Sequence, residues 1–192
     1  DKLTVAVTLR AATDADACIW YLADGTITIH ILSPPNSSPR GMDKTIEIAD
    51  RYGFSTLDFG FSDPNDSPAN ALLAVKIATL PVAGTLTNNG SAVTAGQVVS
   101  VADITAGKLV FNPAANANGN GYASFTFQVQ DNGGTANGGV DTDQSANTIT
   151  INVTSVNDAP SGADKTVATG EDTAYTFTVG DFGFSDIDGN AL

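Results

Sequence analysis

The chain has 192 residues, of which 42% are hydrophobic, so it carries enough apolar side chains for a folded core. Its 21 acidic and 8 basic residues give a net charge of -13, which disfavours nucleic acid and anionic membranes as partners and favours cations. A single cysteine excludes an internal disulfide and a cysteine-based zinc site, and the absence of any run of roughly 20 apolar residues argues against membrane insertion.

The chain repeats itself internally. "TITIHI" at 26–31 returns as "TITINV" at 148–153, "GMDKT" at 41–45 returns as "GADKT" at 162–166, and "DFGFSD" at 58–63 returns unchanged at 181–186. The three matches follow in the same order at nearly one offset, which predicts a building unit of about 122 residues.

In chain order, the first segment already follows this register, because "LTVAVT" at 3–8 aligns with "FTFQVQ" at 125–130. The register predicts four parts: residues 1–33 as the last strands of a preceding unit, 34–40 as a linker, 41–160 as a complete unit, and 161–192 as the first strands of the next unit.

Within the complete unit the sequence pattern is that of β-strands. "SFTFQVQ" places Phe125, Phe127 and Val129 on one face, and "TITINVT" alternates in the same way. "AVKIATL", "GQVVSVADI" and "KLVFNP" supply further strands, and "NNGS", "ANANGNG" and "DNGGTANGG" supply turns. We find no convincing helical pattern. About seven short strands per unit predict an all-β fold, a Greek-key β-sandwich of immunoglobulin-like type repeated in tandem.

Signatures of enzymes are weak. His30 is the single histidine, and its place in "TITIHI" predicts an outward-facing surface position. The chain contains no nucleophile elbow, phosphate-binding loop or dinucleotide fingerprint. We therefore expect the protein not to be an enzyme.

Oxygen donors are abundant, and they gather near the end of the complete unit. Asp131 would follow the sixth strand and Asn157 and Asp158 the seventh, so we expect all three at one pole, with Glu171 and the loop at 186–190 facing them from the next unit. Converging carboxylates repel one another unless a cation lies among them, and hard oxygen donors suit Ca²⁺. The sequence thus predicts a calcium site at the junction. The alternative is a solvated acidic loop.

These segments also carry a family resemblance. "TITINVTSVNDAP" resembles the last strand and linker of cadherin repeats, "EDTAYTF" their acidic first strand, and "SDIDGNAL" their paired-aspartate loop. The chain is still more similar to the cadherin-like tandem repeats of giant bacterial surface adhesins and RTX-type exoproteins. The resemblance covers 41–192 well and 1–33 loosely. It implies a rigid extender in which calcium locks neighbouring sandwiches together.

The resemblance also implies a set of ligands at the second junction: Asp131, Asn157, Asp158, Glu171, Asp172, Asp186, Asp188 and Asn190. The first junction departs from the pattern, because Ser37 stands where Asp158 stands in the second and "EIADRYGF" lacks the acidic pair. We expect weaker calcium binding there, or none. Its candidate ligands are Asn36, Glu47, Asp50, Asp63, Asn65 and Asp66.

Three functions remain open. The first is an extracellular structural repeat of a bacterial adhesin or surface filament, rigidified by Ca²⁺, with neighbouring repeats of the same or another chain as partners. The second is a subunit of a homopolymeric fibre that assembles head-to-tail by donor-strand exchange. The third is an adhesive module for a glycan or protein, for which Trp20 and Tyr21 are the candidate aromatic platform.

Overall fold

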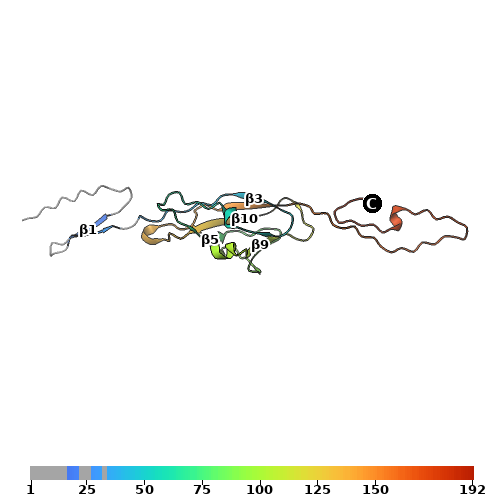
Figure 1. The fold of residues 1–192 in the computed structure, drawn as a ribbon, viewed down its shortest axis with the longest axis horizontal. Helices are drawn as coiled ribbons and strands as arrows, with labels where there is room; N and C mark the ends of the chain where they lie inside the picture. The colour runs from blue at the N-terminus through green and yellow to red at the C-terminus, as the bar shows by residue number, and fades with distance from the viewer. Residues whose placement is uncertain (1–16, 22–26, 32–33) are drawn as a thin grey trace, which may run out of the picture.

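The computed structural model describes residues 17–21, 27–31 and 34–192, and this part of the chain is mostly β-sheet (Figure 1). The prediction of an all-β fold is therefore confirmed. β1 (Ala17–Tyr21) and β2 (Ile27–Ile31) pair in an antiparallel two-stranded sheet of their own. The strand expected at 3–8 lies outside the described residues.

Residues 34–160, which we call the central unit, contain two further sheets. The five-stranded sheet has the order β3-β11-β10-β5-β8, and the four-stranded sheet has the order β4-β9-β6-β7. The strands are β3 (Lys44–Ile48), β4 (Tyr52–Gly53), β5 (Leu72–Ile77), β6 (Thr85–Asn88), β7 (Ser91–Ala92), β8 (Val98–Ser100), β9 (Leu109–Asn112), β10 (Gly119–Asp131) and β11 (Asn147–Val153). β11 pairs antiparallel with β10 and parallel with β3.

The buried faces of both sheets form one hydrophobic cluster. Phe125, Phe127 and Val129 are buried in alternation along β10, as the sequence pattern predicts. Phe125 packs edge-on against Phe54 with ring centroids 5.6 Å apart, and Phe127 packs against Phe59 at 5.0 Å. Fully buried aromatic rings of this kind contribute about 3–5 kcal/mol each when compared with alanine. β10 is therefore the central strand of the core.

Short helices complete the central unit. They are η1 (Thr56–Phe59), α1 (Val101–Thr105) and η2 (Ala136–Gly138). The expectation of no helix was wrong at "GQVVSVADI", where β8 ends and α1 begins at once. The hydroxyl of Ser100 accepts a hydrogen bond from the Asp103 amide at 3.1 Å, which caps the helix and turns the chain away from the sheet.

An ion pair between the buried carboxylate of Asp58 and the exposed Lys44 ties β3 to η1. Lys44 Nζ donates to Asp58 Oδ1 at 2.6 Å, while Tyr52 and Ser55 also donate to this carboxylate. Burial alone would raise the pKa of Asp58, but the hydrogen bonds from Lys44 and Ser55 outweigh it and hold the pKa below its ordinary value. The carboxylate therefore stays charged in the folded protein and fixes the edge strand β3 against the core.

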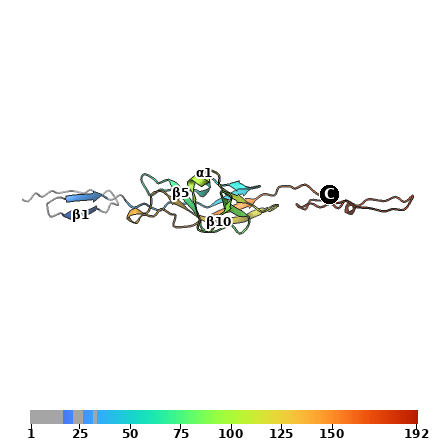
Figure 2. The same cartoon turned by 90° about the horizontal axis from the view of Figure 1, so that it is seen from below.

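Residues 161–192, which we call the C-terminal segment, extend away from the central unit as a long doubled-back loop (Figures 1 and 2). The sequence predicted strands here. The structure instead has one isolated bridge, between Ser161 and Ser185, and the 3₁₀ helix η3 (Val179–Asp181). Within the described residues, no helix combines the length and the apolarity that crossing a membrane requires.

We predict that Asp58→Asn lowers the free energy of unfolding by about 1–3 kcal/mol at neutral pH, because Lys44 and Tyr52 lose a charged acceptor. Since the folded pKa of Asp58 is lowered, its stabilisation is fully present above the ordinary carboxyl pKa of about 4 and is lost as the pH falls below it. Chemical denaturation at several pH values measures this. Asp103→Asn, which breaks the exposed ion pair with Lys108, is the control and should change the stability much less, because water screens both partners. Equal losses in the two variants would contradict the role given to the buried carboxylate of Asp58.

Candidate functional site

The candidate ligands of the central unit separate to two poles. β10 and β11 are antiparallel, with Phe127 opposite Asn147 and Gly119 opposite Val153, so the strands end at opposite poles. Asp131 closes β10 at the pole where the linker enters, the N-terminal pole. Asn157 and Asp158 follow β11 at the C-terminal pole. The prediction that these three residues share one pole was therefore wrong.

At the N-terminal pole, Asn36 of the linker is bound to the loop that follows β10. The side-chain nitrogen of Asn36 donates to Asp131 Oδ1 and to the backbone carbonyl of Val140, both at 2.9 Å. The backbone carbonyl of Asn36 accepts from the Val140 amide at 2.8 Å. The Gly133 amide also donates to Asp131 Oδ1, at 2.8 Å. A Cβ at Gly133 would lie 2.0 Å from Asn36 Oδ1, so the loop needs a glycine to approach the linker this closely.

The loop after η1 encloses the linker from the other side. The Ser37 amide donates to Asp66 Oδ2 at 3.0 Å, and the Asn70 amide donates to Asp63 Oδ2 at 2.6 Å. The side chain of Asn70 donates to Asn36 Oδ1. The linker is thus hydrogen-bonded on two sides before it enters β3.

Two carboxylates at this pole are buried and only partly hydrogen-bonded. Asp131 is 0% exposed and Asp63 is 6% exposed, and Asp131 Oδ2 and Asp63 Oδ1 have no hydrogen-bond partner. Burial raises the pKa of Asp131 against the opposing hydrogen bonds of Gly133 and Asn36, and the charge of Asp63 raises it further. Leaving such oxygens unsatisfied costs about 1–3 kcal/mol or more for each group.

The two carboxylates are the residues at this pole that could hold a hard divalent cation. The two unpartnered oxygens of Asp63 and Asp131, with the amide oxygen of Asn36 beside them, are donors of the type that Ca²⁺ prefers. Across the described ranges, no three His, Cys, Asp or Glu side chains gather closely enough to hold a metal by themselves. A cation bound by these two carboxylates would need amide and carbonyl oxygens as its other ligands, a donor mixture that Ca²⁺ accepts.

The same hydrogen bonds recur at the C-terminal pole. The Asp158 amide donates to Asp188 Oδ2 at 2.6 Å, as the Ser37 amide does to Asp66. Asn190 Nδ2 donates to Asn157 Oδ1 at 2.7 Å, as Asn70 does to Asn36.

Asn190 also repeats the second contact of Asn70, because its amide donates to Asp186 Oδ1 at 3.4 Å where the amide of Asn70 donates to Asp63. The loop at 186–190 therefore holds its linker in the same way as the loop at 63–70.

The two poles differ in burial. Asp158 and Asp186 are half-buried, and Asn157 and Asp188 are exposed. The side-chain nitrogen of Asn157 donates to the Asp158 carbonyl, whereas that of Asn36 donates to a buried carboxylate. A hollow of about 310 Å³, lined in part by Asp50, Asp158 and Asp188, lies at the C-terminal pole.

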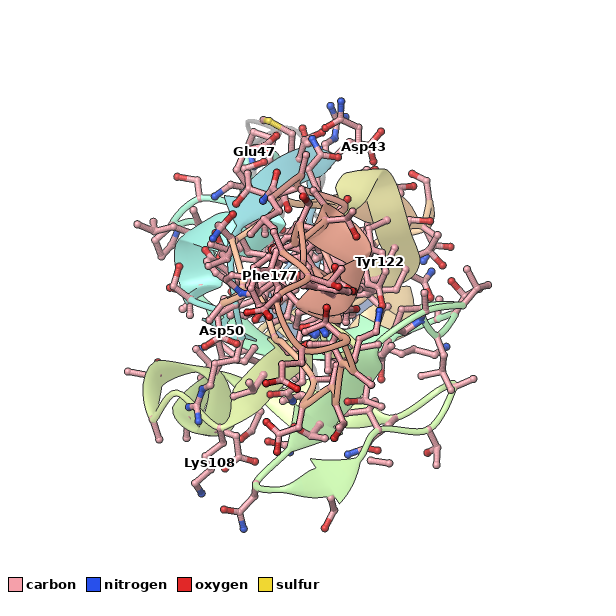
Figure 3. The ribbon with its side chains drawn as sticks, turned by 90° about the vertical axis from the view of Figure 1, so that its right-hand side faces the viewer. Asp43, Glu47, Asp50, Lys108, Tyr122 and Phe177 are labelled. Atoms are coloured by element: carbon pink, nitrogen blue, oxygen red, sulfur yellow. The ribbon has the colours of Figure 1, made fainter. Side chains whose placement is uncertain are left out.

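Besides Asp131, four predicted ligands lie elsewhere than expected. Glu171 and Asp172 form the turn at the far tip of the C-terminal segment, about ten residues and hence about 30 Å of extended chain from the linker. Glu47 lies in β3, and Asp50 lines the hollow at the C-terminal pole, so neither belongs to the first junction. Figure 3 looks at the molecule from the C-terminal end and labels both of these residues.

The remaining first-junction candidates lie at or near the N-terminal pole. Asp63 and Asp66 lie at the N-terminal pole with Asn36, and Asn65 is an exposed residue of the same loop. Sequence reasoning missed Asn70, although its counterpart Asn190 was among the candidates. The recurrence of "NAL" after each aspartate loop was the signal that could have identified it.

Comparison with known proteins gives no match from which the site could be interpreted. No protein-family model matches the chain, and neither does any curated protein or solved structure. The site is therefore interpreted from its own residues. Trp20 and Tyr21, the candidate adhesive platform, lie in β1, whose side chains are outside the described part of the structure.

We predict that Gly133→Ala lowers the free energy of unfolding by about 1–3 kcal/mol, because the added methyl group forces Asn36 away from Asp131. Thermal unfolding measures the change. Gly53→Ala is the control, since a Cβ there meets no atom within 4 Å. An equally stable Gly133→Ala variant would mean that the linker is not held as the structure describes.

Proposed function

We propose that the protein is a non-enzymatic structural module, an extracellular repeat of a bacterial surface adhesin or filament. Its units are Greek-key β-sandwiches of the immunoglobulin-like and cadherin-like kind, arranged in tandem and rigidified at their junctions by Ca²⁺. The observation that carries this proposal is the pair of buried, unpartnered carboxylate oxygens of Asp63 and Asp131 at a junction whose hydrogen bonds recur at the next one.

The fold supports this architecture. Two sheets share one core, and the chain enters the central unit at one pole and leaves it at the other. The C-terminal segment repeats hydrogen bonds found at the start of the central unit, namely those at its linker and those around Asp181, the counterpart of Asp58. A domain whose first contacts recur in the segment that follows it is suited to an extended array of similar units, in which neighbouring units are the partners.

The residues at the N-terminal pole would couple a cation to the stiffness of the linker. Asn36 lies between the two carboxylates, because it donates to Asp131 and accepts from Asn70, whose amide binds Asp63. Bound Ca²⁺ would supply positive charge to the two carboxylates. Because Asn36 belongs to the linker and is hydrogen-bonded at this pole, a shift of the two carboxylates also shifts the linker. Repulsion between the carboxylates would therefore loosen the linker, and a bound cation would hold the linker in place.

An extracellular location agrees with the expected affinity. Extracellular calcium modules bind at about 10⁻⁴ to 10⁻³ M, so such a junction is stiff outside a cell and slack inside one. The strongly acidic composition and the single cysteine are compatible with a secreted protein that does not use disulfides. Slackness before export would assist passage through a secretion channel.

We predict that about 10 mM Ca²⁺ raises the free energy of unfolding of the wild-type protein by about 1.4–2.7 kcal/mol, the gain that millimolar to submillimolar sites give. Mg²⁺ should give a smaller gain, because it gives up its water ligands reluctantly. Thermal unfolding in EDTA, Ca²⁺ and Mg²⁺ measures both effects. A wild-type protein indifferent to Ca²⁺ would overturn the cation part of the proposal.

We further predict that Asp131→Asn stabilises the protein in the absence of calcium and removes its response to Ca²⁺. The raised pKa of Asp131 means that its stabilisation is present below the ordinary carboxyl pKa and is lost as the pH rises, so at neutral pH the charge costs stability. The amide keeps the hydrogen bonds to Oδ1 and removes the buried charge. The variant should therefore unfold at a higher temperature than wild type in EDTA and lose the response to Ca²⁺.

Two controls locate the effect. Asp172→Asn changes an exposed aspartate at the far tip, keeps a left-handed backbone that asparagine tolerates, and should respond to Ca²⁺ as wild type does. Asp158→Ala combined with Asp186→Ala tests the C-terminal pole, where the donors are more exposed, and should retain most of the response. If the double variant alone loses the response, the calcium site lies at the second junction instead.

A further inference from the structure

The C-terminal segment exposes aromatic side chains whose counterparts are buried in the central unit. Phe177 is 61% exposed and Phe182 is 53% exposed, whereas Phe54 and Phe59, at the equivalent places in the repeat, are 2% and 0% exposed. Tyr175 is 39% exposed. Figure 3 shows Phe177 near the centre of the view from the C-terminal end. We call Tyr175, Phe177 and Phe182 the aromatic face.

The rings of the aromatic face, although exposed, are arranged as their buried counterparts are in the central unit. Tyr175 and Phe177 have ring centroids 5.2 Å apart at 77°, against 5.3 Å and 82° for Tyr52 and Phe54. Phe177 and Phe182 lie 6.0 Å apart at 32°, against 5.9 Å and 38° for Phe54 and Phe59.

A polar network holds this geometry. Lys165 Nζ and the Tyr175 hydroxyl donate to Asp181 Oδ1 at 2.6 and 3.0 Å, and the Thr178 amide donates to Asp181 Oδ2 at 2.7 Å. These contacts reproduce those that Lys44, Tyr52 and Ser55 make with Asp58.

The backbone repeats as well. Gly183 has a φ of 53°, and a Cβ there would meet Ala163 at 2.7 Å; Gly60 has a φ of 55°, and a Cβ there would meet Met42 at 2.5 Å. Because this scaffold is already formed, a partner that binds the face does not have to order it first.

The central unit shows what covers such a face. Phe125 and Phe127, two residues apart on β10, pack edge-on against Phe54 and Phe59. β11 runs parallel to β3 and places Ile149 opposite Lys44 and Val153 opposite Ile48. The cover is therefore the antiparallel pair β10–β11.

We propose that the aromatic face is a docking surface for a β-hairpin of the β10–β11 type. One strand of this partner places two aromatic side chains, two residues apart, on Phe177 and Phe182. The other strand alternates Ile or Val with polar residues and runs parallel to residues 165–169, the counterpart of β3. The inference rests on the tandem architecture proposed above but not on its cation, so it is tested in EDTA.

The test extends the full chain after Leu192, which occupies the place of Leu72, with a second copy of residues 73–160. Hydrogen exchange followed by mass spectrometry compares residues 171–184 with and without the extension. We expect their amides to exchange on the order of 100-fold more slowly in the extended chain, because docking makes them part of a cooperative core. Equal exchange in the two chains would overturn the proposal.

Matched variants identify the contact. Phe125→Ser with Phe127→Ser in the appended copy alone should abolish the protection, and so should Phe177→Ser with Phe182→Ser, while exchange in the central unit stays unchanged. Protection that survives either pair of substitutions would contradict the assigned packing. Protection that rises with concentration in the unextended chain would mean that a second copy covers the face, which also overturns the proposal.

Discussion

Strand β10 links the packing of the central unit to its charge. Phe125 and Phe127 occupy the middle of the core, and Asp131, the last residue of the same strand, is buried at the pole where the linker arrives. Burial raises the pKa of Asp131, and the charge of Asp63 raises it further, so the core strand ends in a carboxylate whose charge is disfavoured. A proton or a cation at this place would offset that cost.

The two poles use one hydrogen-bonding scheme under different conditions. At both, an asparagine and the following amide of the linker bind an aspartate loop of the unit that follows. Only the N-terminal pole adds a buried carboxylate from β10, and among the described residues only Asp63 and Asp131 have buried carboxylate oxygens without a hydrogen-bond partner. At both poles the linker is therefore fastened to the unit that it enters.

The sequence predicted the strands well and the junctions poorly, for physical reasons. Alternation fixes which face of β10 is buried, because Phe125 and Phe127 fall two residues apart. It does not say which end of a strand lies at which pole, and one error in strand direction moved Asp131 to the wrong junction. Ser37 stands where the second junction has Asp158, and this difference suggested the loss of a ligand. In the structure both residues bind the aspartate loop through the backbone amide, which any residue but proline supplies.

The parallel pairing of β3 with β11 has a mechanical consequence. These are the first and last strands of the central unit, they lie side by side, and the chain enters one at the N-terminal pole and leaves the other at the C-terminal pole. Tension between the two poles therefore slides one strand past the other and loads all the ladder hydrogen bonds together, in shear. A unit pulled in this way resists extension until the whole ladder fails at once, whereas a hairpin pulled from its open end loses its bonds one at a time.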